Sequence, residues 1–165
     1  MIRCAILFAA LSALGLGACN RNSATGNDRE AQMDPAPAPA PRMPAAQALS
    51  GIATEAVQAE TMSDADTASL GGLQGKCVIR LTAVGFPSFM HDGRGGVIKL
   101  NGKLIPLRAD RDGMFADGQL RVVVRPVDDK FNADGVREAD MIVMLPEAKD
   151  EIGYRGYEDC SRRTG

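Results

Sequence analysis

From Cys77 onward, apolar and polar residues alternate with a period of two, which is typical of strands that bury one face. The clearest case surrounds Asn101-Gly102, because Asn-Gly supplies the two positive φ angles of a type I′ hairpin turn. A two-residue loop pairs Leu100 with Lys103, and every second residue then shares a face. The apolar face of this predicted hairpin contains Ile98, Leu100, Ile105 and Leu107.

The same reasoning predicts four more strands, and Asp-Gly turn signals punctuate this half of the chain at 92–93, 112–113, 117–118 and 134–135. Regular turns without long helical windows predict a mainly β fold. We expect a small antiparallel sandwich or partly closed barrel of about six strands. Besides the two arms of the hairpin, these are Cys77–Val84, Gln119–Pro126, Asp140–Leu145 and Ile152–Cys160.

Two helical patterns precede the strands. The Ala-rich stretch 44–62 predicts a marginal helix, weakened by Gly51. Ser63 followed by Asp66 has capping-box spacing, and Gly71-Gly72 supplies a stop. A short helix is therefore predicted directly before the β domain.

The first nineteen residues have the layout of an export signal. One positive charge at Arg3 is followed by an apolar run that is too short to span a bilayer. The run ends in Leu16-Gly17-Ala18-Cys19, which resembles the lipobox of bacterial lipoproteins. The resemblance implies cleavage before Cys19 and acylation of the new N-terminal cysteine. An ordinary secretory peptide with a chance cysteine is the alternative.

The resemblance also implies an address in the bacterial cell envelope. In the enterobacterial rule, aspartate directly after the lipidated cysteine retains a lipoprotein in the inner membrane. This chain has Asn20 at that position, which favours the outer membrane, facing the periplasm. The chain then divides into a signal peptide (1–18), a lipidated N-terminus with a disordered Pro/Ala-rich tether (19–44), a marginal helical segment (45–72), a β domain (73–161) and a tail (162–165). A partner that reads the Pro-rich tether is an open alternative to a plain spacer.

Cys4 belongs to the expected signal peptide and Cys19 is the expected lipid attachment point. The other two cysteines, Cys77 and Cys160, lie at the two ends of the predicted β domain. In an oxidising compartment, such a pair predicts a disulfide between the first and last strands. A metal site is the rival use of two cysteines. The chain has a single histidine and no C-x-x-C spacing, so neither a metal nor another cofactor is expected.

Charge and motifs narrow the function classes. A net charge of −2 gives no bulk attraction to nucleic acid, so no nucleic-acid partner is expected. The chain contains no G-x-S-x-G, H-E-x-x-H or P-loop motif, and no nucleophile motif accompanies His91. We therefore expect no catalytic residues and no enzyme activity.

Two segments form the candidate binding surface. The predicted loop 85–96 gathers apolar and basic residues between Gly and Pro, and the tail of the last strand holds both tyrosines of the protein. For both segments the sequence favours packing, against the barrel end for the first and around the disulfide for the second, and binding is the functional alternative. The candidate residues are Phe86, Phe89, Met90, His91, Arg94, Tyr154, Arg155 and Tyr157.

The sequence thus predicts a non-catalytic lipoprotein that binds a protein or envelope component. Its size, disulfide and lipid anchor are similar to those of the periplasmic lysozyme-inhibitor lipoproteins, which are small β-barrels. The similarity covers architecture alone, because the Ser-Gly-Ala-Arg-Tyr type segment of that family is missing. An accessory or structural subunit of an envelope assembly is the alternative. A small hydrolase or ligand carrier needs a pocket, for which about 85 residues leave little volume.

Overall fold

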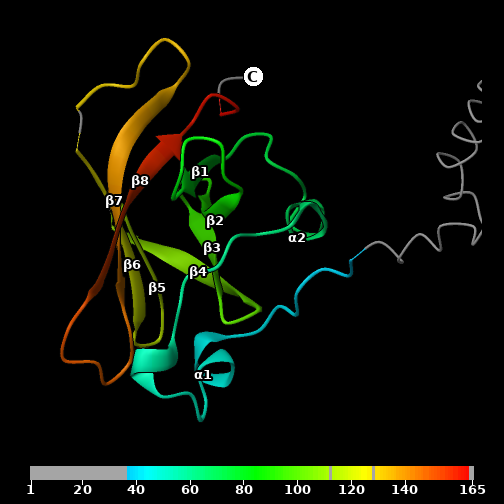
Figure 1. Ribbon diagram of the computed structural model, residues 1–165, viewed down its shortest axis with the longest axis vertical. Coiled ribbons are helices and arrows are strands. Elements are labelled where there is room, and N and C mark those ends of the chain that lie inside the picture. Colours follow the sequence, from blue (N-terminus) through cyan, green and yellow to red (C-terminus); the bar gives the residue numbers. More distant parts are fainter. Residues whose placement is uncertain (1–36, 112, 128, 164–165) are drawn as a thin grey trace, which may run out of the picture. The chain divides into compact units, whose positions relative to one another are not determined.

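Eight antiparallel strands form a closed barrel in sequence order, with β8 pairing back onto β1 (Figure 1). The structure is a computed structural model, which describes residues 37–111, 113–127 and 129–163. The mainly β prediction is confirmed, and closure of the barrel replaces the expected sandwich or partly closed barrel. The strands are β1 (Cys77–Arg80), β2 (Pro87–His91), β3 (Gly95–Leu100), β4 (Lys103–Arg111), β5 (Met114–Asp117), β6 (Leu120–Pro126), β7 (Val136–Met144) and β8 (Ile152–Asp159).

The predicted hairpin is the β3–β4 pair. Asn101 and Gly102 have φ angles of 43° and 71°, and Leu100 pairs with Lys103. All four residues of the predicted apolar face are buried inside the barrel. The turn therefore sets the register that the sequence predicted.

Two of the eight strands, β2 and β5, were not expected from the sequence. All five residues of β2 are buried, so the strand lacks the alternation that marks a half-exposed strand. β5 has four residues between Gly113 and Gly118 and is too short to give a pattern. The expectation that 85–96 forms one loop is therefore wrong, since β2 and the start of β3 occupy most of it.

The described chain before β1, residues 37–76, folds along the barrel and over one end of it (Figure 1). We call it the N-terminal segment. The marginal helix over 44–62 is reduced to α1 (Ala45–Ala48) and a 3₁₀ turn, η1 (Thr54–Ala56). Ala45, Ala48 and Val57 join the barrel core at the end where β7 and β8 are connected. The helical segment is therefore part of the packed domain.

The predicted capping box is present at α2 (Asp64–Ser69). The Ser63 side chain accepts a hydrogen bond from the backbone N–H of Asp66, and the Asp66 carboxylate accepts one from the N–H of Ser63. Gly71 follows with a φ of 82° and ends the helix. This prediction is confirmed to the residue because every group involved is local.

The expected tether extends less far than residue 44. The backbone of 41–43 pairs with Leu104, where Leu104 donates to the carbonyl of Pro41 and Met43 donates to the carbonyl of Leu104. The N–H of Ala40 also donates to the Asp66 carboxylate at 2.6 Å. Residues 40–44 are thus held against the barrel.

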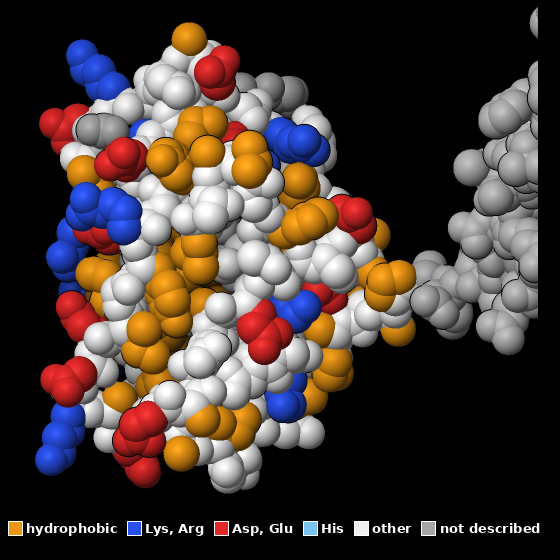
Figure 2. Space-filling view, in the orientation of Figure 1, with side chains coloured by type: hydrophobic (Ala, Val, Ile, Leu, Met, Phe, Trp, Pro, Cys, Tyr) orange, Lys and Arg blue, Asp and Glu red, His pale blue; other side chains and the backbone are white. Residues whose placement is uncertain are grey.

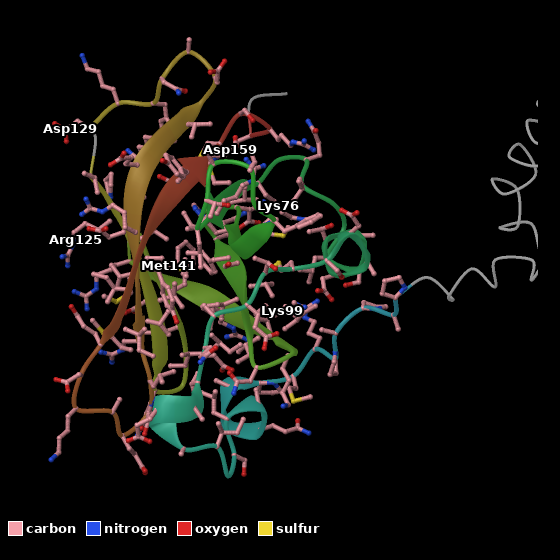
Figure 3. All side chains as sticks on the ribbon, in the orientation of Figure 1. Lys76, Lys99, Arg125, Asp129, Met141 and Asp159 are labelled. Atoms are coloured by element: carbon pink, nitrogen blue, oxygen red, sulfur yellow. A yellow bond between two sulfur atoms is a disulfide. The ribbon has the colours of Figure 1, made fainter. Side chains whose placement is uncertain are left out.

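A second apolar cluster lies on the outer wall of the barrel, beneath α2. It consists of Met62, Val78, Met90 and Leu104. Lys99, which is labelled in Figure 3, also lies on the outer wall. It forms an ion pair with Asp66. β1 and β2 are therefore buried on both faces, inside by the core and outside by the N-terminal segment.

Within the described part of the chain, no helix has the length and apolar content to cross a membrane.

The disulfide predicted between Cys77 and Cys160 is present. Cys77 begins β1 and Cys160 directly follows β8, at the point where Val78 pairs with Asp159. We call this end of the barrel the disulfide end, and the opposite end, covered by α1 and η1, the helix end.

A candidate binding site at the mouth of the barrel

The disulfide end of the barrel is open. A cavity of about 720 Å³ lies there, lined by residues from six of the eight strands and by Arg163 after the last strand. We call it the mouth. Its lining residues are His91, Gly93, Ala109, Asp110, Arg111, Gly113, Phe115, Val124, Pro126, Arg137, Glu158 and Arg163.

His91, the last residue of β2, lies beneath the mouth against aromatic side chains. Its ring stacks on Phe89 with a centroid distance of 5.6 Å and lies 5.0 Å from Phe115. The residue is 8% exposed, and both ring nitrogens are buried without a hydrogen-bond partner among the residues that the structure describes. Buried polar atoms are almost always satisfied, so this imidazole is an exception that requires an explanation.

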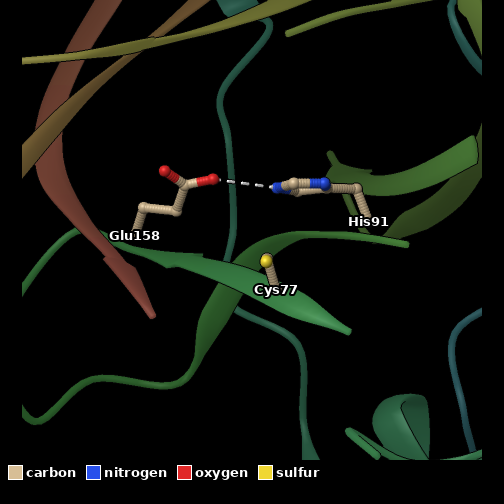
Figure 4. Close-up of side chains that lie close together, drawn as sticks. All are labelled: Cys77, His91 and Glu158. Carbon is tan, nitrogen blue, oxygen red and sulfur yellow. Dashed lines mark ion pairs between the residues drawn. The ribbon is translucent and has the colours of Figure 1, made fainter. Parts of the chain in front are cut away.

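Glu158 lies on β8 and faces His91 on β2, with β1 between the two strands. Its Oε1 lies 3.3 Å from His91 Nε2, without hydrogen-bond alignment (Figure 4). Its Oε2 accepts a hydrogen bond from Nε of Arg137 on β7 at 2.7 Å, and an Nη of the same guanidinium lies 2.6 Å from it in an ion pair. The Arg137 guanidinium also lies 4.2 Å from the centroid of the Phe131 ring. Arg137 thus fixes one carboxylate oxygen and leaves the other facing the imidazole.

The electrostatics of Glu158 follow from these neighbours. Burial raises the pKa of the carboxyl group, but contacts with His91 and Arg137 outweigh this effect and hold the pKa below its ordinary value. Glu158 is therefore a buried carboxylate at neutral pH. Its charge is balanced by Arg137, which is itself four-fifths buried.

Cys77 lies beside this pair at the base of the mouth (Figure 4). Its sulfur, His91 nitrogen and Glu158 oxygen lie within 4.8 Å of one another. The sulfur is bonded to Cys160, so it offers no thiolate in the oxidised protein. An Nη of Arg163 lies 4.0 Å from it.

The structure places the residues of the predicted binding surface in three different environments. Phe89 is buried in the barrel core, and Met90 is buried in the second apolar cluster on the outer wall. Neither residue can therefore form part of a binding surface. His91 is buried beneath the mouth. Phe86 is 53% exposed in the β1–β2 connection, at the helix end, and Arg94 is exposed in the β2–β3 turn. The predicted surface around 85–96 is therefore not one surface.

The tail residues lie on opposite faces of β8. The Tyr154 side chain faces the barrel core near the helix end, where its hydroxyl accepts a hydrogen bond from the N–H of Ala59 at 3.2 Å. Arg155 points outward and forms a bidentate ion pair with Asp140. Tyr157 is half-buried on the same outward face as Arg155. Arg155 and Tyr157 remain available to a partner, and Tyr154 does not.

Sequence reasoning missed Arg137 and Glu158, which with His91 define the mouth. A period-two signal marks both. Glu158 shares a face with Ile152 and Tyr154, and Arg137 shares a face with Met141 and Val143. A charged residue on an otherwise apolar strand face points to a buried polar site.

The surface around the barrel carries both signs of charge. Figure 2 shows basic and acidic side chains mixed along the edge formed by β7 and β8. A second cavity, of about 510 Å³, lies at the helix end between α1 and the β5–β6 turn. Its lining lacks the buried, unsatisfied imidazole that marks the mouth.

Comparison with known proteins gives a family. Neither a curated protein nor a solved structure matches the chain. One family model, described as a domain of unknown function (DUF6692), matches residues 15–163, nearly the whole chain. The protein therefore belongs to the DUF6692 family.

Proposed function

We propose that this protein is a non-catalytic binding module of the bacterial cell envelope, held to a membrane by a lipid on Cys19. Its binding site is the mouth, and its ligand is a small amphipathic part of an envelope component. The observation that carries the proposal is the buried imidazole of His91, whose nitrogens have no hydrogen-bond partner at the base of an open cavity. Eight-stranded barrels are wide enough to hold one small ligand at such an end.

The lining of the mouth is mainly polar and favours a ligand with an acidic group and a small apolar part. Phe115 and Val124, which are 2% and 7% exposed, supply a small apolar patch at its base. The lining contains three cationic and two acidic side chains, which are Arg111, Arg137, Arg163, Asp110 and Glu158. Arg137 is paired with Glu158 and Arg111 lies beside Asp110. Among the described residues of the lining, this leaves Arg163 to meet a carboxylate or phosphate.

The binding test uses 1-anilinonaphthalene-8-sulfonate, an apolar probe with one negative charge, on the full chain in mild detergent. We expect fluorescent binding to the folded protein, a loss of about tenfold in affinity for Arg163→Glu, and abolition by Ala109→Phe, which fills the mouth. Arg162→Glu is the matched control, since it makes the same charge change outside the lining. Equal binding by all four proteins would place the probe elsewhere and refute the mouth as the site.

The anchoring test is fractionation of cells that produce Cys19→Ser. The lipobox-like sequence supports export and lipidation, and a disulfide suited to an oxidising compartment supports export. We expect the variant in the soluble periplasmic fraction and the parent in the outer membrane. Unchanged membrane association would contradict lipid anchoring at this residue.

A role as an accessory subunit of an envelope assembly is the second candidate. Val84 and Phe86, in the β1–β2 connection, are 97% and 53% exposed, and apolar exposure of this kind is typical of a protein contact. A photocrosslinking residue at position 84 should capture one dominant partner in cells. The same residue at Lys149, exposed in the β7–β8 loop, is the control. Equal products from both positions would rule out a specific contact.

A further inference from the structure

We propose that reduction of the Cys77–Cys160 disulfide converts the base of the mouth into a zinc-type metal site, with Cys77, His91 and Glu158 as ligands. The inference does not depend on the proposed function. It explains the imidazole of His91 by giving Nε2 a partner in the reduced protein.

The His91–Glu158 geometry already suits a shared metal ion. Bonds of about 2.0–2.2 Å at tetrahedral angles put nitrogen and oxygen ligands about 3.4 Å apart. The observed separation of Nε2 and Oε1 is 3.3 Å, and the two atoms are not aligned as a hydrogen bond. The lone pairs of both groups can therefore converge on one ion between them.

The sulfur of Cys77 completes the set after reduction. Tetrahedral geometry requires about 3.6 Å between sulfur and each of the other ligands, and the three ligand atoms already lie within 4.8 Å. Once the bond to Cys160 is broken, rotation of the Cys77 side chain supplies the remaining movement of about 1 Å. Thiolate, imidazole and carboxylate together suit Zn²⁺ or Co²⁺.

Two arginines support this ligand set. Arg137 holds Oε2 of Glu158 at 2.6–2.7 Å and so orients Oε1 toward the site, as the hydrogen-bonded neighbours of metal ligands do. Arg163 lies 4.0 Å from the Cys77 sulfur, where its charge favours the thiolate. The mouth borders His91 and Glu158, which leaves a fourth position open to a ligand from solvent.

The redox step is a thiol–disulfide exchange. A dithiol reductant transfers two electrons and two protons to the Cys77–Cys160 bond, which breaks to give two thiols, while the reductant forms its own disulfide. Metal binding then releases the proton of the Cys77 thiol. The oxidised protein has only two of the three ligands, so the disulfide closes the site.

The test uses the full chain with Cys4→Ser and Cys19→Ser, so that Cys77 and Cys160 are the remaining cysteines. Adding Cys160→Ser frees Cys77 without a reductant. We expect this variant to bind one Co²⁺ per chain with a sulfur-to-cobalt charge-transfer absorption, and to bind Zn²⁺ at least about 100-fold more tightly than the oxidised parent. Chemically reduced parent should behave in the same way.

The ligand assignments are tested in the Cys160→Ser background. His91→Leu and Glu158→Gln should each weaken Zn²⁺ binding by about 100-fold or more, whereas Glu138→Gln, on the outer face of β7, should leave it unchanged. If Cys160→Ser is unfolded without metal, Zn²⁺ should restore the β circular dichroism signal. Absence of a thiolate band, failure of zinc to refold an unfolded variant, or equal binding by the oxidised parent would each overturn the proposal.

Discussion

Asp66 and Lys99 form an ion pair of 2.8 Å between α2 and the outer wall of the barrel, and Asp66 is only 1% exposed. The same carboxylate accepts hydrogen bonds from the N–H groups of Ala40 and Ser63. One side chain thus joins three parts of the chain: the backbone at Ala40, the start of α2 and strand β3. It is a polar connection between the barrel and the chain that covers its outer wall, in addition to the backbone hydrogen bonds of Met43 and Met62.

This carboxylate predicts acid sensitivity. Burial by itself raises the pKa of Asp66, but Lys99 and the N–H groups of Ala40 and Ser63 reverse the effect and hold the pKa at about 2, below the ordinary 3.8. Because the pKa of the folded state is depressed, the contribution to stability is complete above pH 3.8 and is lost as the pH falls toward about 2. The shift corresponds to about 2 kcal/mol.

Urea unfolding of the parent and of Asp66→Asn, followed across this pH range, measures that contribution. We expect Asp66→Asn to be less stable at neutral pH by about 2 kcal/mol or more, and the gap to the parent to narrow between pH 3.8 and about 2. Asp64→Asn, an exposed neighbour, is the control. A gap independent of pH would show that the charge of Asp66 contributes little.

Gly156 is required by the closure of the barrel. A Cβ at this position of β8 would collide with the carbonyl oxygen of Arg80 on β1. Gly156→Ala should therefore lower the free energy of unfolding by about 1–3 kcal/mol. Gly153→Ala, in the same strand with open space around the new methyl group, should change it by less than about 0.5 kcal/mol. Thermal or urea unfolding distinguishes the two, and equal effects would contradict the tight β1–β8 approach.

His91 should be dispensable for folding. A buried polar group without a hydrogen bond costs about 1–3 kcal/mol, but the imidazole also lies 3.3 Å from the buried Glu158 carboxylate and helps to keep it charged. The two effects oppose each other, so His91→Leu should change the free energy of unfolding by less than about 1 kcal/mol. Phe89→Leu, at the neighbouring inward position, should lower it because it leaves a cavity. Urea unfolding of both variants distinguishes the two effects. A marked loss of stability for His91→Leu would mean that the imidazole supports the fold.

The disulfide should supply a large part of the stability. Its sequence separation of 83 residues corresponds to about 4.5 kcal/mol in the chain-entropy model. We expect the double variant Cys77→Ser/Cys160→Ser to lose a comparable free energy of unfolding, measured by urea denaturation. Reducing the parent should produce the same loss, and adding reductant to the double variant should produce none. A double variant as stable as the parent would contradict the prediction.

Local signals in the sequence were sufficient for the turn at Asn101-Gly102 and for the capping box of α2. In both cases the residues that determine the structure lie within a few positions of one another, so tertiary contacts do not alter the result. The Cys77–Cys160 disulfide was predicted from the expected oxidising compartment and from the positions of the two cysteines at the ends of the predicted β domain.

The missing elements depend on contacts between distant segments. β2 is buried on its outer face because the N–H of Met62 donates to the carbonyl of Pro87 and the N-terminal segment covers the strand. A strand covered on both faces has no polar side to reveal it. His91 and Glu158 are 67 positions apart in the sequence, and only the pairing of β1 with both β2 and β8 brings them together.

Closure of residues 77–160 into a covalent loop also determines how the chain responds to tension. If the two ends of the protein are pulled apart, the bond between the cysteines carries the load past the entire barrel. A separation of 83 residues corresponds to about 280 Å of extended chain that pulling cannot release while the bond is intact. Force reaches the N-terminal segment instead, where, among the described residues, the hydrogen bond from Ala40 to Asp66 is loaded first and the backbone pairing of 41–43 with Leu104 next.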